Sequence, residues 1–381
     1  MKEPDMEQRL KRLVEGNSET NMVKWAQEAK KQSKPIVGMT CPYVPEEVII
    51  AAGMHPWRIT GSHSPSLSRA LAYRSIDSDG YHSHIVESIL AGELDFLDAV
   101  INTSREDDSR ALDCVIGSLD KFSLVHLMSV PQIDTALAVS YYAYQIEGLK
   151  SALEALSGKV ITAAALSQAI ELCNETRGLL RKIYELRKRP WPAVSGMEAL
   201  GIAMSARIMN KEEFNKELKE LLPYLDGRKA PLKSVQLRLL VSGDTLDDPR
   251  YLQLIEEQGC VVAMDDLDTG SRYCWEDCKI DGSDPISSLA KHYLSLPDFA
   301  RQINWDRQLD RIIQWVREFD VHGVLELRQL YQLSRQTRTP FLIKNFKEAG
   351  IPFFSIERDY QLSASGQLGT RVGAFLETLS L

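Results

Sequence analysis

Residues 36–61, IVGMTCPYVPEEVIIAAGMHPWRITG, contain the signals that decide the fold. The short apolar run that ends at Met39 predicts a strand, and the apolar run Val48–Ala52, closed by Gly53, predicts a helix directly after it. Cys41 stands between them, at the carboxyl end of the strand, where open α/β sheets bind ligands. A helix N-terminus at this place stabilises a thiolate or an anionic ligand. A lone cysteine is more often an inert buried side chain, so its position alone leaves both interpretations open.

The composition is that of a soluble globular protein, with 44% hydrophobic and 26% charged residues. A chain of 381 residues is too long for one ordinary core and predicts two domains. No apolar run approaches the roughly 18 residues of a membrane span, and the charged N-terminus lacks the apolar core of a signal peptide. Six irregularly spaced cysteines indicate reduced thiols, and the net charge of -8 disfavours a nucleic-acid surface. We therefore expect a cytoplasmic protein of the enzyme type, without a membrane or nucleic-acid partner.

Strand and helix signals alternate along most of the chain. Residues 1–34 indicate a polar helical segment, and residues 135–222 a long helical stretch broken at Pro190 and Pro192. The expected strands are residues 36–39, 96–102, 122–130, 235–242, 261–264, 321–327 and 352–356. The other expected helices are residues 46–53, 83–90, 249–258, 284–294, 305–319, 340–350 and 370–379. This alternation predicts βαβ units and a mainly parallel sheet in each half.

The stretch GRKAP at residues 227–231 interrupts this pattern and marks a boundary. We predict an α/β protein with two Rossmann-like domains. A helical N-terminal segment (residues 1–34) precedes an N-terminal α/β domain with a long helical insertion (35–228), and a C-terminal α/β domain (229–381) completes the chain.

Three separated segments together resemble one family. They are CPYVPEEVIIAAGMHPWRITG at 41–61, AMDDLDTGSRY at 263–273 and IERDYQLSASGQLGTRVGAFLETL at 356–379. Their wording and order resemble component D of the 2-hydroxyacyl-CoA dehydratases, whose superfamily includes benzoyl-CoA reductase subunits. The likeness spans residues 36–381, which covers both α/β units.

The resemblance implies a [4Fe–4S] cluster held between two α/β domains by cysteines from three loops. It also implies a separate ATP-dependent iron–sulfur activator, which injects an electron that reaches the acyl-CoA thioester and makes a ketyl radical anion. Dehydratases of this kind then expel a hydroxyl group, whereas benzoyl-CoA reductases reduce the ring. The cluster supplies the redox chemistry, while the protein supplies ligands, a dry site and orientation.

This chain keeps one of the three cysteines that the family pattern expects. Cys41 matches the first ligand, and the family's Cys-Asp-x-x-Arg pattern puts Glu106 at the second. Counting back from Pro340 puts Gln332 at the third. A carboxylate and an amide are poor replacements for thiolates, so a cluster bound here would be labile. Cys114 is an alternative ligand if the loop after Glu106 shifts locally.

Two interpretations of this departure remain open. In the first, the chain is the cluster-poor subunit of a heteromer, and the working cluster belongs to a related paralogous subunit. In the second, it is a diverged non-catalytic binding or scaffold paralogue without a cluster. The resemblance favours the first, because such dehydratases and reductases are built from two related subunits. The sequence contains neither a GxxxxGK[ST] loop nor a GxGxxG turn after a strand, so we expect no nucleotide to bind to this chain.

Arginines and glutamates elsewhere in the three segments have plain and functional interpretations. Arg272 and Arg371 could each pair with a CoA phosphate, and an internal salt bridge is the alternative for both. Glu46 and Glu47 open a predicted helix, where its dipole stabilises carboxylates whatever the function.

Two further groups of side chains could hold a cation. Asp265, Asp266 and Asp268 directly follow a predicted strand, where they either bind a cation or serve turn and capping geometry. Cys274 and Cys278 are four residues apart, but two thiols fall short of a tetrahedral site, so we expect them to be packed side chains.

Overall fold

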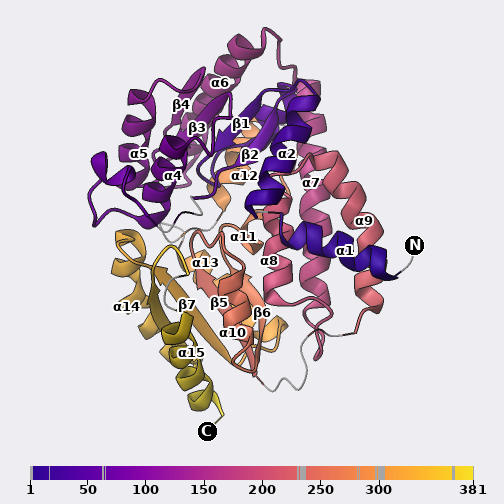
Figure 1. The fold of residues 1–381 in the computed structure, drawn as a ribbon, viewed down its shortest axis with the longest axis vertical. Coiled ribbons are helices and arrows are strands. Elements are labelled where there is room, and N and C mark those ends of the chain that lie inside the picture. The colour runs from indigo at the N-terminus through magenta and orange to yellow at the C-terminus, as the bar shows by residue number, and fades with distance from the viewer. Residues whose placement is uncertain are drawn as a thin grey trace.

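The fold consists of two parallel four-stranded sheets, one above the other, with helices around both (Figure 1). This confirms the predicted α/β class. The structure is a computed structural model, and it describes residues 3–16, 18–61, 64, 66–229, 231, 237–280, 282, 284–296, 298, 305–362 and 365–380.

The N-terminal sheet has the strand order β2-β1-β3-β4, with every neighbouring pair parallel. Its strands are β1 (Ile36–Met39), β2 (His55–Arg58), β3 (Ala99–Thr103) and β4 (Leu124–Met128). The helices of this part are α3 (Glu46–Ala51), α4 (Gly80–Ala91), α5 (Asp107–Ser118) and α6 (Ala136–Ser157), with a 3-10 turn η1 at Ala70–Ala72. Both central strands, β1 and β3, are buried at every position, as expected when helices cover both faces of a parallel sheet.

The C-terminal sheet repeats this plan with the order β6-β5-β7-β8, again all parallel. Its strands are β5 (Leu237–Gly243), β6 (Cys260–Asp266), β7 (Gly323–Gln329) and β8 (Phe353–Arg358). Its helices are α10 (Arg250–Glu256), α11 (Ser271–Cys274), α12 (Pro285–Ser295), α13 (Trp305–Glu318), α14 (Leu333–Glu348) and α15 (Ser365–Leu379).

A set of helices lies beside both sheets, on the right in Figure 1. It comprises α1 (Glu3–Val14), α2 (Glu19–Lys31), α7 (Ala163–Leu186), α8 (Gly196–Ser205) and α9 (Lys211–Gly227). The predicted break at Pro190 and Pro192 falls between α7 and α8 and is confirmed. Helix α12, from the C-terminal half, packs against α6 of the N-terminal half, so the two halves exchange contacts through helices as well. The predicted domain boundary at 228/229 stays a prediction.

Two helix predictions were incomplete or wrong. The helix expected to begin at Pro340 begins at Leu333, and Pro340 lies inside α14. A proline inside a helix removes one backbone hydrogen bond but does not always end the helix. Helix α5 was not predicted at all. The segment that contains Cys114 was expected to be a loop, and it is helical.

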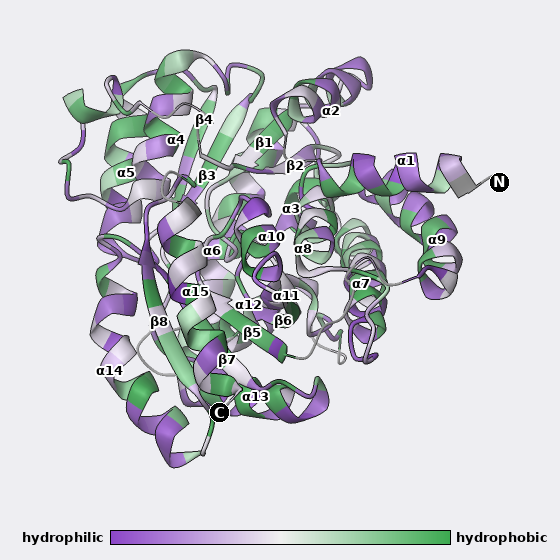
Figure 2. Cartoon of the chain, turned by 60° about the horizontal axis from the view of Figure 1, so that its bottom comes forward, coloured by the Kyte–Doolittle hydropathy of each residue, from purple (hydrophilic) through white to green (hydrophobic). Residues whose placement is uncertain are grey.

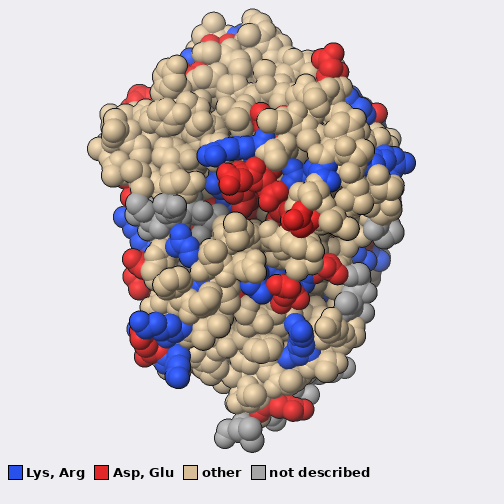
Figure 3. All heavy atoms as spheres, turned by 90° about the vertical axis from the view of Figure 1, so that its left-hand side faces the viewer, with Lys and Arg blue, Asp and Glu red and all other residues tan. Residues whose placement is uncertain are grey.

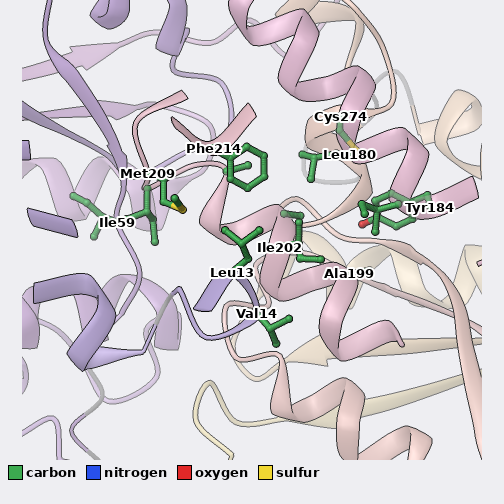
Figure 4. Close-up of a cluster of buried hydrophobic side chains, with 14 of the residues drawn as sticks. Leu13, Val14, Ile59, Leu180, Tyr184, Ala199, Ile202, Met209, Phe214 and Cys274 are labelled. Carbon is green, nitrogen blue, oxygen red and sulfur yellow. The ribbon is translucent and has the colours of Figure 1, made fainter. Parts of the chain in front are cut away.

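One large apolar cluster joins the two halves and the lateral helices. Figure 4 shows Leu13 of α1, Ile202 of α8 and Phe214 of α9 close to Leu180 and Tyr184 of α7. Strands are mostly hydrophobic in Figure 2, while several outer helices alternate in hydropathy along their length, as expected for one buried face.

The charges on the surface and the hydropathy of the helices bear on whether the protein binds nucleic acid or a membrane. On the face shown in Figure 3, acidic and basic side chains are mixed near mid-height and the upper part is mostly uncharged. Among the described residues, this face therefore shows no extended basic patch of the kind that binds nucleic acid. No helix within the described ranges combines the length and the apolar character that a membrane crossing requires.

Candidate functional site

The residues predicted at the three cysteine positions line one cavity between the two halves. Cys41, Glu106 and Gln332 all line this cavity, which is small, with about 10 Å³ of free space, or room for about one water molecule. Each follows the carboxyl end of a parallel strand, β1, β3 and β7 respectively. Ligands bind at this edge of open α/β sheets because the chain leaves the sheet there in loops and helix starts.

Hydrogen bonds between neighbouring strands hold the loops around Cys41 in place. The hydroxyl of Thr40 donates to the side chain of Asn102 on β3 at 2.6 Å. The amide of Asn102 in turn donates to the backbone oxygen of Ser109 on α5 at 2.7 Å. The first turn of α5 is thereby fixed against the end of β1, next to the cavity.

Burial dominates the acid–base properties of the cavity residues. It raises the pKa of the Cys41 thiol, although the nearby charges of Arg105 and Arg58 oppose the shift. It also raises the pKa of Glu106 to about 7, against the opposing charges of Arg105 and His82. The thiol is therefore protonated at neutral pH, and Glu106 exchanges its proton near neutrality.

Asp79, His82 and Ser109 form a hydrogen-bonded chain in the same cavity. Nδ1 of His82 lies 2.9 Å from Oδ1 of Asp79, and Nε2 lies 3.2 Å from Oγ of Ser109. All three side chains are buried and line the cavity. These residues were missed by the sequence analysis. The available signal was the Asp-x-x-His spacing at the start of α4, where Asp79 caps the helix by accepting from the backbone N–H of His82.

A buried network of charges adjoins the cavity. Nε of Arg105 lies 2.7 Å from Asp298, while Asp244 lies 3.6 Å from Arg105 and 3.2 Å from Arg272. Arg335 reaches Asp244 as well, at 3.4 Å. Burial acts to raise the pKa of Asp244, but the charges of these arginines outweigh it and hold that pKa below its usual range. Arg272 therefore lies in an internal ion network, which was the plainer of its two predicted roles.

Arg272 and Arg371 lie in different hollows. Arg272 lines a cavity with about 30 Å³ of free space together with Tyr43, Tyr273 and Tyr293. This cavity and the cavity of Cys41 are lined by neighbouring parts of the chain. Cys41 lines the first cavity, and Tyr43, two residues later, lines this one. Arg371 is exposed in a separate cleft of about 220 Å³ at the end of β8 and the start of α15.

The remaining cysteines lie elsewhere. Cys114 is exposed on α5 and is not part of the cavity wall. Cys274 and Cys278 are both buried, and they belong to two different apolar clusters. Cys274 lies among the side chains shown in Figure 4, as expected for a packed thiol.

Protein groups contact the three aspartates at the end of β6 and just after it, although Oδ1 of Asp266 and Oδ1 of Asp268 have no hydrogen-bond partner among the described residues. Asp265 accepts from the backbone N–H of Ser271 at 2.8 Å, and Asp268 accepts from the hydroxyl of Thr245 at 3.0 Å. Asp266 accepts from Ser242 at 2.9 Å and from Gln308. The contact of Asp265 with Ser271 agrees with the turn-forming interpretation, whereas the partners of Asp266 and Asp268 come from other parts of the chain. Within the ranges that the structure describes, no group of three or more His, Cys, Asp or Glu side chains is placed to hold a metal ion.

The donor set of the main cavity does not fit the [4Fe–4S] cluster that the family resemblance implies. Cys41 is the one thiol in its described wall, and burial favours the protonated form of that thiol. Such clusters are held mostly by thiolates, and neither the carboxylic acid of Glu106 nor the amide of Gln332 replaces one. We therefore derive no step through a cluster in this chain.

Comparison with known proteins gives a consistent result. Residues 41–379 match the sequence model of the family described as 2-hydroxyglutaryl-CoA dehydratase, D-component. The chain is 25% identical to the (R)-phenyllactyl-CoA dehydratase beta subunit of Clostridium sporogenes, over 90% of this chain and 91% of that protein. It is 26% identical to the beta subunit of the (R)-2-hydroxyglutaryl-CoA dehydratase of Acidaminococcus fermentans, over 92% and 94% of the two chains. It is also 26% identical to a subunit of the benzoyl-CoA reductase of Thauera aromatica, over 92% of each chain.

Proposed function

This chain belongs to the 2-hydroxyglutaryl-CoA dehydratase D-component family, and from that premise we propose that it is the cluster-poor subunit of a heteromeric acyl-CoA enzyme. In this proposal the working [4Fe–4S] cluster belongs to a related paralogous subunit, and a separate ATP-dependent iron–sulfur activator supplies electrons. The complex works in a reducing cytoplasm on an acyl-CoA substrate.

The names of the relatives support the heteromeric part of the proposal. They denote the beta subunit of a dehydratase in two cases and one subunit of a reductase in the third. Each of these names describes one chain of a larger enzyme. Because the likeness covers at least 90% of each chain compared, it extends to both α/β units.

The observation that supports a cluster-poor subunit is the single thiol in the described wall of the cavity. The residues that match the family's three cysteine positions meet at one place, as a shared ancestral site would require. Two of them, Glu106 and Gln332, lack the thiolate that iron–sulfur clusters need. With these residues at the predicted positions, the chain keeps one thiol of three at this place, which supports the assignment as a supporting subunit.

The adjoining aromatic cavity and the Arg371 cleft suggest how this chain would still bind an acyl-CoA. Tyr43, Tyr273 and Tyr293 supply apolar rings with polar tips around about 30 Å³ of free space, which would admit a small acyl group only if these rings move. Arg371 is exposed and stands in the first turns of α15, where the helix dipole and the guanidinium both favour a phosphate. Since the two hollows are separate, one CoA molecule would have to span them.

Anaerobic purification of this chain with its co-expressed related subunit tests the proposal. We expect a stable complex whose iron and acid-labile sulfide stay unchanged when Cys41→Ala is introduced here. Cys114→Ala is the matched control, because that thiol lies outside the cavity. A loss of iron in Cys41→Ala, with none in Cys114→Ala, would show that Cys41 is a ligand and that this chain shares the cluster.

The alternative function is a non-catalytic binding or scaffold protein. The absence of thiols at Glu106 and Gln332 favours this alternative as much as it favours a supporting subunit. The two functions differ in whether the chain forms a complex with a related subunit. A chain that forms no complex with a related subunit, and leaves the turnover of that subunit unchanged, would be the scaffold paralogue.

A further inference from the structure

We propose that the outer edge of the N-terminal sheet is the surface on which the related subunit of the heteromer docks. This surface, the β4 edge, consists of strand β4 and the exposed sides of α5 and α6, which both contact that strand. The inference rests on the proposed function, which supplies the related subunit. It adds the place on this chain where that subunit binds.

Strand β4 is an open edge of its sheet. Among the described residues, β3 is the one strand that pairs with it. Strand β3 is buried at every position, whereas β4 is buried only at Met128, and its Leu127 is 38% exposed. An open edge presents unpaired backbone N–H and C=O groups, with which a second chain can form hydrogen bonds.

The corresponding edge of the other sheet is protected, and β4 is not. Because the two sheets have the same strand order, β8 occupies the place of β4 in the C-terminal sheet. Strand β8 carries Glu357, which pairs with Arg328 at 2.7 Å. Charged side chains on an edge strand keep other strands from adding to it. Strand β4 has the sequence LVHLM, without any Asp, Glu, Lys or Arg, so it lacks this protection.

Helix α6 adds large apolar side chains beside β4. Leu137 is 80% exposed, Tyr141 45% and Tyr144 71%, and their helical spacing puts them on one face. The exposed positions from 137 to 151 are Leu137, Ser140, Tyr141, Tyr144, Glu147, Gly148 and Ser151. One of these seven is charged, whereas the outer side of a helix that faces water is normally rich in charged residues.

The exposed side of α5 is small and uncharged after Arg110. It consists of Ala111, Cys114, Gly117 and Ser118. No described atom lies within 4 Å of the place that a Cβ of Gly117 would occupy, so the space outside this helix is open. Helix α5, β4 and α6 lie together at the upper left of Figure 1, and Figure 3, which views the molecule from that side, shows a mostly uncharged upper part.

The size of this surface fits a protein partner. Leu127, Leu137, Tyr141 and Tyr144 together expose on the order of 500 Å² of mainly apolar surface, which is large for a monomer. A stable interface buries about 800 Å² on each partner, with an apolar centre and a polar rim. The four side chains therefore suffice for the centre of one such interface.

The absence of charge selects the occupant. A partner that covers this surface must itself present an apolar and uncharged face, which excludes a nucleic-acid backbone. A related subunit shares the fold and therefore has its own β4 edge. Chains of the same fold associate most simply about a two-fold axis, through equivalent surfaces. The occupant is thus the corresponding edge of the related subunit.

Charge placed on the β4 edge tests the assignment in the full chain, co-expressed anaerobically with the related subunit. The double variant Leu137→Glu/Tyr144→Glu should raise the Kd of the complex at least about 30-fold, as measured by analytical ultracentrifugation. Val23→Glu is the matched control, because Val23 is 53% exposed on α2, toward the β2 side of the sheet (Figure 1). The control should bind as the unaltered chain does, and circular dichroism verifies that both variants fold.

Cys114 provides a second measurement that needs no substitution. It is exposed on α5, whereas the other cysteines are buried. N-ethylmaleimide should therefore alkylate Cys114 first in the chain alone. The rate should fall at least about tenfold in the complex, since a docked interface excludes solvent from its centre. Mass spectrometry of the peptide that contains Cys114 follows the reaction.

Three outcomes would overturn the assignment, and they separate it from the subunit proposal. If the unaltered chain forms no complex with the related subunit, the proposed function fails and the docking surface with it. If a complex forms that neither the double variant weakens nor Cys114 is protected in, the subunit proposal stands and the interface lies elsewhere. If the chain alone forms a dimer that the double variant dissociates, while the heteromer stays intact, the β4 edge binds a second copy of this chain instead.

Discussion

Two neighbouring parts of the segment that follows β1 differ in how their buried polar groups are paired. The carboxylates of Glu46 and Glu47 are almost completely buried, and each has both a cation and a tyrosine hydroxyl as partners. The partners are Lys211 at 2.9 Å and Tyr273 at 2.6 Å for Glu46, and Arg177 and Tyr293 (2.7 Å) for Glu47. A few residues earlier, Cys41 faces a cavity where Arg58 has an unsatisfied nitrogen and where Glu106 has a raised pKa.

The difference distinguishes a paired structural site from a candidate functional one. Burial acts to raise the pKa of Glu46, but Lys211 and Tyr273 outweigh it and keep that pKa below its usual value. At Glu106, burial prevails over Arg105. Because Tyr273 and Tyr293 come from the C-terminal half, the two glutamates clamp the halves together. The clamp carboxylates are each paired with a cation at close range, whereas the raised pKa of Glu106 marks the cavity as a candidate ligand site.

The largest expected effect is the loss of the clamp at Glu47. Glu47→Ala leaves Arg177 as an uncompensated buried charge, which costs about 3–5 kcal/mol of the free energy of unfolding. Urea denaturation followed by circular dichroism measures it. Glu147→Ala removes an exposed carboxylate paired with Lys150, and we expect a change within about 0.5 kcal/mol. An equal loss of unfolding free energy in the two variants would contradict the view that the buried pair at Glu47 holds the fold.

The next effect concerns Glu106, whose replacement should raise the free energy of unfolding rather than lower it. Its pKa in the folded chain is about 7, against an ordinary 4.5, so folding favours the protonated acid. The free energy of unfolding therefore falls as the pH rises from about 4.5 to about 7. Glu106→Gln removes this fall and should be more stable than the unaltered chain at pH 8, by up to about 3 kcal/mol. At pH 4 the two should agree, and parallel stability curves from pH 4 to 8 would contradict the assignment.

A smaller effect is expected for the coupling between Glu46 and Lys211. A double-mutant cycle with alanine at each position should give a coupling free energy of about 1–2 kcal/mol. The pair of Arg9 and Glu220 has a similar distance of 2.8 Å but is partly exposed, so its coupling should stay below about 1 kcal/mol. A surface pair that couples as strongly as the buried one would mean that burial is not what strengthens the clamp.

Much of the fold was predictable from local patterns. The bounds of β1 were predicted as they occur, because an apolar run that ends before a turn is a local signal. Helix α5 was missed, since its sequence DDSRALDCVIGS is polar at the start and buries few residues. Pro340 misled the prediction of α14, because a local rule for proline cannot see the packing that holds the helix together.

The site was predictable only in part. Cys41, Glu106 and Gln332 were expected in one place from the family pattern, and they line one cavity. Whether any of them binds a metal stays a prediction. The bond between His82 and Ser109 depends on the packing of α4 against α5, which no local pattern encodes. The unsatisfied nitrogen of Arg58 is likewise a property of the folded cavity and not of the sequence.

The most direct test of the central claim is the iron and acid-labile sulfide content of each separated chain after anaerobic purification of the complex. The account predicts about four irons on the related subunit and none on this chain, because one protonated thiol does not hold a cluster. About four irons on this chain alone would contradict it and would show that Cys41, with its unusual neighbours, suffices as a cluster site.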